Sequence, residues 1–154
     1  MESEYFQDHI PHNHCYGCGP ANVQGLKLKS RWQGEESVAV FAPQPWHAAG
    51  PEQFLNGGII ATLIDCHCIC TAIADCYHRE GRAIGSEPHI WCVTASLKVD
   101  YLKPARIDQP VKLGASVVEA SGKKIRVVCA LLSGDQECAR GDVLAIRVDA
   151  SWRG

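Results

Sequence analysis

Two groups of residues in one apolar segment have types and spacing that could do chemistry together: the Asn56-Gly57-Gly58 tripeptide and the carboxylate of Asp65. The segment runs from Leu55 to His78 and contains no proline and no glycine after Gly58. A carboxylate in such surroundings can act as a general base or as a nucleophile. Backbone N–H groups at the glycines can stabilise an oxygen that develops negative charge.

The same segment predicts one long helix over residues 59–78, which must position these groups. On a helical wheel Asp65 lies on a face of apolar and small residues, and a carboxylate there is costly unless it is paired or hydrogen-bonded. Asp65 is therefore either a buried acid held by strand amides or an arginine, or a functional carboxylate. The polar arc of the wheel, which we expect to face water, contains His67, Thr71, Asp75 and His78.

The start of the helix offers a second functional feature. The first N–H groups of a helix have no partner within it and lie at the positive end of its dipole. Gly57 and Gly58 leave these groups unshielded, and Asn56 can cap the helix or donate to the same oxygen. Capping alone would also explain Asn56, because Asn-Gly is a common turn dipeptide.

Composition narrows the function classes. The chain has 154 residues, which predicts a single domain over residues 1–154, and a hydrophobic content of 46% is typical of a globular protein. With 15 basic and 17 acidic residues, the net charge of −2 gives no basis for a nucleic-acid or anionic-membrane partner. Charged residues interrupt the apolar segment, so we expect no membrane span.

The nine cysteines indicate reduced thiols that serve as small apolar residues in a cytoplasmic protein, since no secretory signal pattern precedes them. Residues 1–25 form an irregular lead-in rich in His, Gly and Pro. Its Cys-x-x-Cys beside histidines could hold zinc, but the spacing fits no standard zinc finger and equally suits a turn-rich segment. We therefore expect no metal, with this open alternative resting on His9, His12, His14, Cys15 and Cys18.

The other elements are strands and loops. We expect strands at 26–32, 37–41, 91–102, 111–118, 125–132 and 137–149, the last one broken at Gly141. The loop 42–53 carries His47 and leads directly to Asn56, which places this histidine at the mouth of the same site. Tight turns between consecutive strands make the sheet antiparallel, so the fold class is α+β, with a helix apolar enough to favour a dimer.

This order of elements, with Asn56-Gly57-Gly58 and an acid nine residues after Asn56, resembles the hotdog-fold thioesterases, and most closely the phenylacetate-pathway (PaaI-like) acyl-CoA thioesterases. The stretch from Cys15 to Asn22 and the strand end from Val99 to Ala105 are also similar to that family. The resemblance implies a hotdog fold, in which a curved antiparallel sheet of five to six strands wraps one central helix. It covers about residues 15–150.

The resemblance also implies roles for particular residues. Asp65 would be the base or nucleophile, with Gly57 as oxyanion donor, and Asn56 stands where the family has histidine, so it can donate a hydrogen bond but cannot act as a base. Thr94 matches the family's water-orienting Ser or Thr, although simple alternation puts it on the face opposite Leu97 and Val99, so a bulge or a dimer contact is needed. Substrate contacts would come from His47, Gly58, Arg106, Lys123, Lys124 and Arg126.

The implied substrate is a small, aromatic or medium-chain acyl-CoA, for which Trp46 and Trp91 would suit the acyl group, with no cofactor beyond the coenzyme A in the substrate. The family implies a homodimer whose interface contains the site, or a dimer of dimers. Three alternatives stay open: a hotdog hydratase or dehydratase, a non-catalytic acyl-CoA or ligand-binding protein, and a metal or redox protein built on the N-terminal Cys and His residues.

Overall fold

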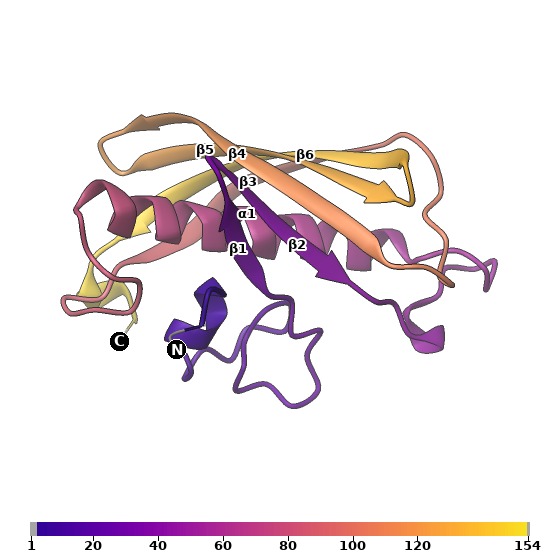
Figure 1. Cartoon of the computed structure of the whole chain (residues 1–154), viewed down its shortest axis with the longest axis horizontal. Helices are drawn as coiled ribbons and strands as arrows, with labels where there is room; N and C mark the ends of the chain where they lie inside the picture. Colours follow the sequence, from indigo (N-terminus) through magenta and orange to yellow (C-terminus); the bar gives the residue numbers. More distant parts are fainter. Residues whose placement is uncertain (1–2, 154) are drawn as a thin grey trace.

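A computed structural model describes residues 3–153 of the chain. The long helix α1 (Gly57–Arg79) lies across one face of a single sheet, and the N-terminal segment lies on the other side of this helix (Figure 1). The helix begins two residues earlier and ends one residue later than expected. It is long and apolar enough to cross a membrane, but 61% of its most apolar 18-residue stretch is buried inside the domain.

The sheet has the order β1-β2-β4-β5-β6-β3, and all its neighbouring strands are antiparallel. Its strands are β1 (Ser30–Gln33), β2 (Glu36–Phe41), β3 (Trp91–Tyr101), β4 (Val111–Ser121), β5 (Lys124–Ser133) and β6 (Gln136–Val148). Hairpins join β4 to β5 and β5 to β6 through Gly122 and Gly134, whose positive φ angles suit tight turns. The expected α+β arrangement of one long helix on an antiparallel sheet is confirmed.

The expected break at Gly141 is wrong, because β6 runs through this residue without interruption. Gly141 has another use. A Cβ atom at this position would lie 2.2 Å from Cγ2 of Ile64, which is fully buried on α1. The glycine therefore lets the helix approach the sheet closely at the residue that precedes Asp65.

The expectation that His67, Thr71 and Asp75 face water is also wrong, and only His78 of that arc is exposed. Strands β1 and β2 cover this side of the helix and bring polar partners with them. His67 Nδ1 lies 2.8 Å from Ser30 Oγ, and Ser37 Oγ lies 2.6 Å from Thr71 Oγ1. Burial lowers the pKa of His67 to about 4, so the imidazole is neutral in this network.

The expected strand at 26–32 forms only in its second half, since β1 begins at Ser30. Lys27 has a φ angle of 54°, in the left-handed region, and cannot continue a strand. The Leu28 N–H instead donates to the Gly17 carbonyl at 3.0 Å. The first half of this segment thus closes the N-terminal loop rather than extending the sheet.

The N-terminal segment includes two short contacts with the core. A 3-10 helix, η1 (Phe6–His9), buries Phe6 to 2% exposure, and the loop after it buries Cys18 to 4%. Two more 3-10 helices, η2 (Pro45–His47) and η3 (Ala150–Arg153), lie before α1 and after β6. The lead-in is irregular, as expected, but it packs against the side of α1 that the sheet leaves uncovered.

Candidate active site

Asp65 lies near the middle of α1 and is half-buried. Its carboxylate oxygen Oδ1 accepts a hydrogen bond from Thr94 Oγ1 on β3, with 2.6 Å between the two oxygens. Burial raises the pKa of the Asp65 carboxyl above its ordinary value, and the hydrogen bond from Thr94 lowers it by less. The acid is therefore held in a defined orientation in partly dry surroundings, as a general base or nucleophile requires.

A β-bulge makes this contact possible. The pairing of β3 with β6 shifts between Thr94 and Ser96, so that one extra residue, Ala95, lies in β3. After an extra residue the side chains of a strand change face. Thr94 therefore faces α1, as do Val99 and Tyr101. In a regular strand Thr94 would lie on the opposite face from these two residues, because it is an odd number of residues away from each. The need for a bulge, derived from simple alternation, is met.

The start of α1 is built by the loop that precedes it. Asn56 caps the helix, because its Oδ1 accepts the N–H of Ile59 at 3.1 Å. Its own N–H donates to the carbonyl of His47 at 2.9 Å, which fixes the direction in which the chain enters the helix. Gly57 is the first residue of α1, and Gly58 is exposed beside it. The capping role of Asn56 is confirmed, and this role uses the side-chain oxygen Oδ1 rather than the side-chain nitrogen Nδ2.

His47 has a structural task at this entrance. Its side chain is buried, and Nδ1 accepts the N–H of Gln44 at 2.9 Å. Burial lowers the pKa of His47 below its ordinary value. The ring packs between Phe41 and Trp46, with centroid distances of 5.4 and 5.7 Å. His47 thus supports the turn that presents the helix start.

The basic residues expected to contact coenzyme A lie in different places. Arg106 is close to the helix start, since it bridges to Phe54, and it forms two hydrogen bonds with Asp108 at 2.8 and 2.6 Å. Arg126 lies on β5 and is paired with Asp142. Lys123 is exposed in the β4–β5 turn at the opposite end of the molecule, where its carbonyl accepts the Arg147 N–H, and Lys124 is exposed beside it.

Tyr101 is a site residue to which the sequence analysis gave no role. Its hydroxyl donates to the carbonyl of Gly57, with 2.6 Å between the two oxygens. This bond ties the end of β3 to the first turn of α1 and orients the peptide there. The position of Tyr101 at the end of an alternating strand was visible in the sequence, but its contact with a residue 44 positions away was not.

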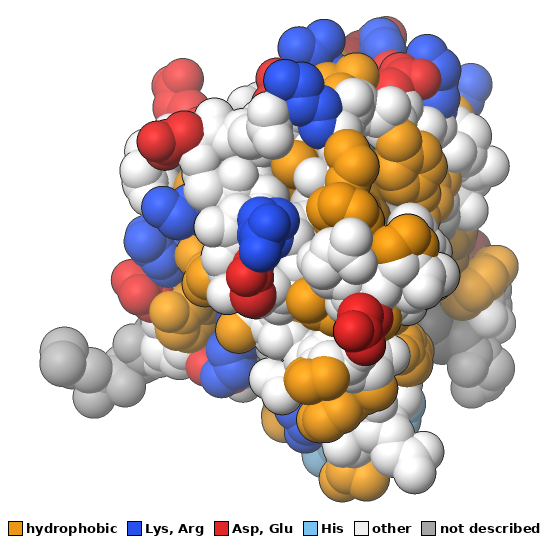
Figure 2. Space-filling model, turned by 90° about the vertical axis from the view of Figure 1, so that its right-hand side faces the viewer, with side chains coloured by type: hydrophobic (Ala, Val, Ile, Leu, Met, Phe, Trp, Pro, Cys, Tyr) orange, Lys and Arg blue, Asp and Glu red, His pale blue; other side chains and the backbone are white. Residues whose placement is uncertain are grey.

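The exposed surface at this end of the molecule is partly apolar. Figure 2 shows hydrophobic side chains in several patches here, with Lys and Arg gathered along the upper rim. Trp46, Tyr101 and Leu102, which flank the helix start, are 77%, 55% and 45% exposed. Trp91 is half-buried at the far end of β3 and packs against the core instead. Of the two tryptophans considered for an acyl group, Trp46 is the one near the helix start.

Comparison with known proteins agrees with this arrangement. The family model described as the thioesterase superfamily matches residues 52–139, a span that contains Gly57, Asp65 and Thr94. The crystal structure of a thioesterase superfamily protein from Shewanella loihica PV-4 is 34% identical, with a TM-score of 0.66 over 90% of this chain and 96% of that one. The E. coli PaaI protein shares the fold at 13% identity, with a TM-score of 0.65 over 80% and 81% of the two chains.

A curated relative is longer than this chain. Acyl-coenzyme A thioesterase THEM4 of Rattus norvegicus is 28% identical over 100 residues, which are 65% of this chain and 37% of that protein. The chain therefore spans less than half the length of the curated relatives it matches. The family model, however, covers more than half of this chain, and the Shewanella relative is matched over nearly its whole length. With its long helix on an antiparallel hotdog sheet, the chain belongs to the thioesterase superfamily.

Proposed function

We propose that the protein is an acyl-CoA thioesterase that uses Asp65 on the thioester and the first turn of α1 as its oxyanion hole. The observation that carries this proposal is the 2.6 Å hydrogen bond from Thr94 to Asp65 across a β-bulge. The bulge lets Cys92 before it and Val99 after it both face the core, and it turns Thr94 toward the Asp65 carboxylate. Bulges are over-represented next to active sites. Membership of the thioesterase superfamily supports the same chemistry.

The reaction balances with groups that the chain provides. Water, with its proton passing to Asp65, attacks the thioester carbonyl, and the new oxyanion is stabilised by the N–H of Gly57. The carbon–sulfur bond then breaks, and the thiolate of coenzyme A takes the proton back from Asp65 as the carboxylic acid forms. In the nucleophilic route Asp65 attacks the carbonyl and the carbon–sulfur bond breaks, which releases the thiolate and leaves a mixed anhydride. Water then hydrolyses the anhydride, so that the Asp65 carboxylate and the carboxylic acid are released and the thiolate takes up one proton. Both routes place Thr94 as the group that orients the acid.

The distance along α1 supports a site that is shared between two copies of the chain. Asp65 follows Gly57 by eight residues, which at 1.5 Å per residue separates them by about 12 Å along the axis. One carbonyl group cannot contact both groups of the same helix. We therefore propose a homodimer in which Asp65 of one protomer faces the helix start of its partner. The centre of β3, an edge strand of the sheet, is exposed from Thr94 to Lys98 and offers the surface for this contact.

The acyl group is proposed to be small and either aromatic or of medium length. The exposed side chains of Trp46, Tyr101 and Leu102 beside the helix start give an apolar surface of that kind. Of the basic residues predicted to contact coenzyme A, Arg106 lies at this end of the molecule and could bind a phosphate by exchanging its partner Asp108 for the ligand.

A matched pair of variants at Gly57 tests the oxyanion hole. Proline at the first helical position removes only an N–H that has no partner in the helix, and Asn56 already has the extended backbone (φ −58°, ψ 134°) that precedes a proline. Alanine keeps the N–H, and its Cβ would meet the Tyr101 ring at an ordinary 3.6 Å. We expect Gly57→Pro to lower kcat for acyl-CoA hydrolysis by about 10²- to 10³-fold and Gly57→Ala to keep most of it.

Mixing two inactive variants tests the shared site. Dimers formed between Gly57→Pro and Asp65→Asn chains contain one site with both groups intact. After unfolding and refolding together in equal amounts, the mixture should recover about a quarter of wild-type activity, because half of the dimers are mixed and each has one intact site. A mixture as inactive as its components would refute the shared site. Binding of acyl-CoA without turnover by the wild type would favour a ligand-binding protein instead.

A further inference from the structure

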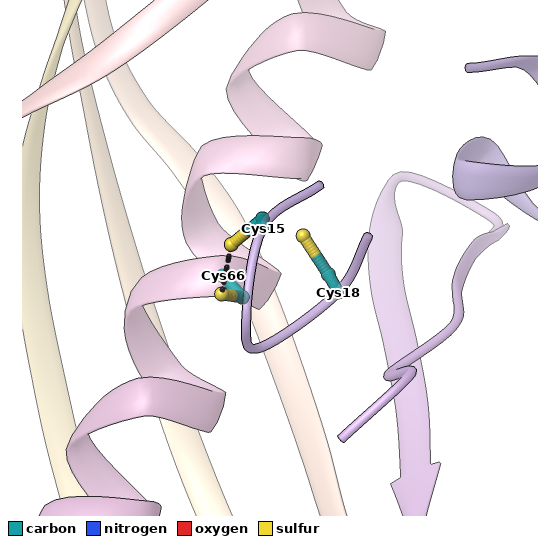
Figure 3. A group of neighbouring side chains, drawn as sticks. All are labelled: Cys15, Cys18 and Cys66. Carbon is teal, nitrogen blue, oxygen red and sulfur yellow. Dashed lines mark hydrogen bonds between the residues drawn. The ribbon is translucent and has the colours of Figure 1, made fainter. Parts of the chain in front are cut away.

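Three cysteine thiols that are distant in sequence converge beside α1. Cys15 and Cys18 belong to a tight N-terminal loop, and Cys66 belongs to the helix against which this loop lies (Figure 3). The three sulfur atoms all lie within 4.8 Å of one another. The Sγ atoms of Cys15 and Cys66 are 3.5 Å apart, although 51 residues separate them. The hydrolysis proposed above makes no use of this cluster.

The separations match a tetrahedral thiolate site. With Zn–S bonds of about 2.3 Å, the sulfur atoms of a tetrahedral zinc site lie about 3.8 Å apart. A fourth sulfur is available one helical turn after Cys66, because Cys70 Sγ lies 3.6 Å from Cys18 Sγ. The set is then a loop Cys-x-x-Cys together with a helical Cys-x-x-x-Cys, whose members share one helix face. Because Cys70 lies outside the group whose sulfur atoms are all within 4.8 Å of one another, its sulfur must move toward the other three to complete the site.

The loop is shaped around these sulfur atoms. A Cβ atom at Gly17 would lie 2.2 Å from Cys66 Sγ, so only glycine lets the loop lie flat on the helix at this point. A Cβ atom at Gly19 would lie 2.4 Å from the Cys15 nitrogen, which shows how tightly the Cys-x-x-Cys turn is wound.

Asn13 supports the same loop with both ends of its amide. Its Oδ1 accepts the Cys15 N–H at 2.9 Å, and its Nδ2 donates to Cys18 Sγ at 3.8 Å. Such outer hydrogen bonds to a ligand sulfur are typical of metal sites. The neighbouring histidines do not take part in the cluster: His9 Nε2 lies 2.8 Å from the Ser3 carbonyl oxygen, and His12 and His14 are exposed.

We propose that Cys15, Cys18, Cys66 and Cys70 bind one Zn²⁺ ion as a structural site. The four thiols release four protons, and the four thiolates fill the coordination sphere, so no open position remains for catalysis. Cys15 is only partly buried, which gives the ion a route to the site. Zinc would fasten the N-terminal loop to α1 directly beside Asp65. This proposal replaces the expectation of no metal and differs from the Cys-His set considered from sequence.

The test uses the whole chain, purified under a phosphine reductant that keeps the thiols reduced. One equivalent of Co²⁺ should give the intense sulfur-to-cobalt charge-transfer bands of a tetrahedral thiolate site, and Zn²⁺ should bleach them. The variants Cys15→Ser, Cys18→Ser and Cys66→Ser should each lose most of this absorbance. Cys138→Ser is the matched control, because Cys138 is buried on β6 and its thiol donates only to backbone carbonyls, which a hydroxyl can also do.

A measurement on the wild-type chain keeps the test valid if a variant fails to fold. Zinc should protect Cys15, the partly exposed ligand, from alkylation, as read by mass spectrometry, and should raise Tm. The proposal is wrong if reduced protein binds no zinc or cobalt, or if zinc leaves the alkylation of Cys15 unchanged. Full charge-transfer intensity in Cys70→Ala would overturn the four-thiolate form, and unchanged cobalt spectra in the other three variants would place the metal elsewhere.

Discussion

Substitution of Gly141 on β6 tests the close packing of α1 against the sheet. In Gly141→Ala the new Cβ would lie 2.2 Å from Cγ2 of Ile64, about 1.3 Å short of the roughly 3.5 Å at which two carbon atoms pack. Ile64 is fully buried, and Gly141 is paired with strands on both sides, so neither can move alone. We expect the variant to lose about 1–3 kcal/mol of unfolding free energy, with Tm lower by about 2–12 °C.

The second half of this prediction is a rescue. Ile64→Ala removes Cγ1, Cγ2 and Cδ1 and leaves only Cβ, which would lie 3.5 Å from the new Cβ at position 141, an ordinary contact. Alone, Ile64→Ala should cost about 2–5 kcal/mol because it leaves a cavity. The double variant should therefore be more stable than the sum of the two losses by about 1–3 kcal/mol.

Urea unfolding at one fixed protein concentration measures this cycle, since an unchanged slope with a shifted midpoint reports stability alone. A Gly141→Ala protein within about 0.5 kcal/mol of the wild type, the usual range for harmless substitutions, would refute the close approach. Strict additivity in the double variant would refute Ile64 as its cause. Because Ile64 precedes Asp65, the same substitution should also lower hydrolytic activity in the folded protein.

Two further predictions concern the groups around the site. Thr94→Val removes the hydrogen bond to Asp65, which is worth about 1.5–3 kcal/mol for a charged acceptor, so kcat should fall about 10- to 150-fold. Thr94→Ser keeps the hydroxyl and should keep most of kcat. Equal losses of kcat in the two variants would show that the hydroxyl is not required. Burial lowers the pKa of His47, and its Nδ1 already accepts the Gln44 N–H. As pH falls, the unfolded chain therefore binds a proton at His47 before the folded chain does. The free energy of unfolding should decrease as pH falls below about 6.5. In His47→Gln this loss of stability, measured as urea midpoints from pH 7.5 downward, should be smaller than in the wild type. The side chains packed on the His47 ring, Phe41 and Trp46, are uncharged. His67 also has a lowered pKa, but it contributes the same pH dependence to both proteins.

Much of the fold could be predicted because its signals are local. An uninterrupted apolar segment and tight glycine turns define the helix and the hairpins without any long-range information. The burial of the polar arc of α1 could not be predicted this way, because polar side chains on a helix can be satisfied either by water or by serines of a covering strand. Ser30 and Ser37 bind His67, and nothing near the helix in sequence announces that β1 and β2 cover it.

The candidate site shows the same limit. The spacing of Asn56, Gly57 and Asp65 was visible, and so was the need for Thr94 to leave the regular alternation of its strand. The bulge itself depends on how β3 pairs with β6, which no local pattern encodes. In the same way, the Cys-x-x-Cys motif could be seen, but the third thiol of its cluster comes from a helix 51 residues away.

The central claim is that Asp65 carries out thioester hydrolysis. The most direct measurement is the turnover of a panel of aromatic and aliphatic acyl-CoAs by the wild type and by Asp65→Asn, followed by the loss of thioester absorbance because nine protein thiols would react with a thiol dye. Asp135→Asn, at an exposed carboxylate in the β5–β6 turn, is the control. We expect the wild type and the control to hydrolyse at least one substrate, and folded Asp65→Asn to lose about 100-fold or more in kcat. Equal turnover by the wild type and Asp65→Asn would contradict the account.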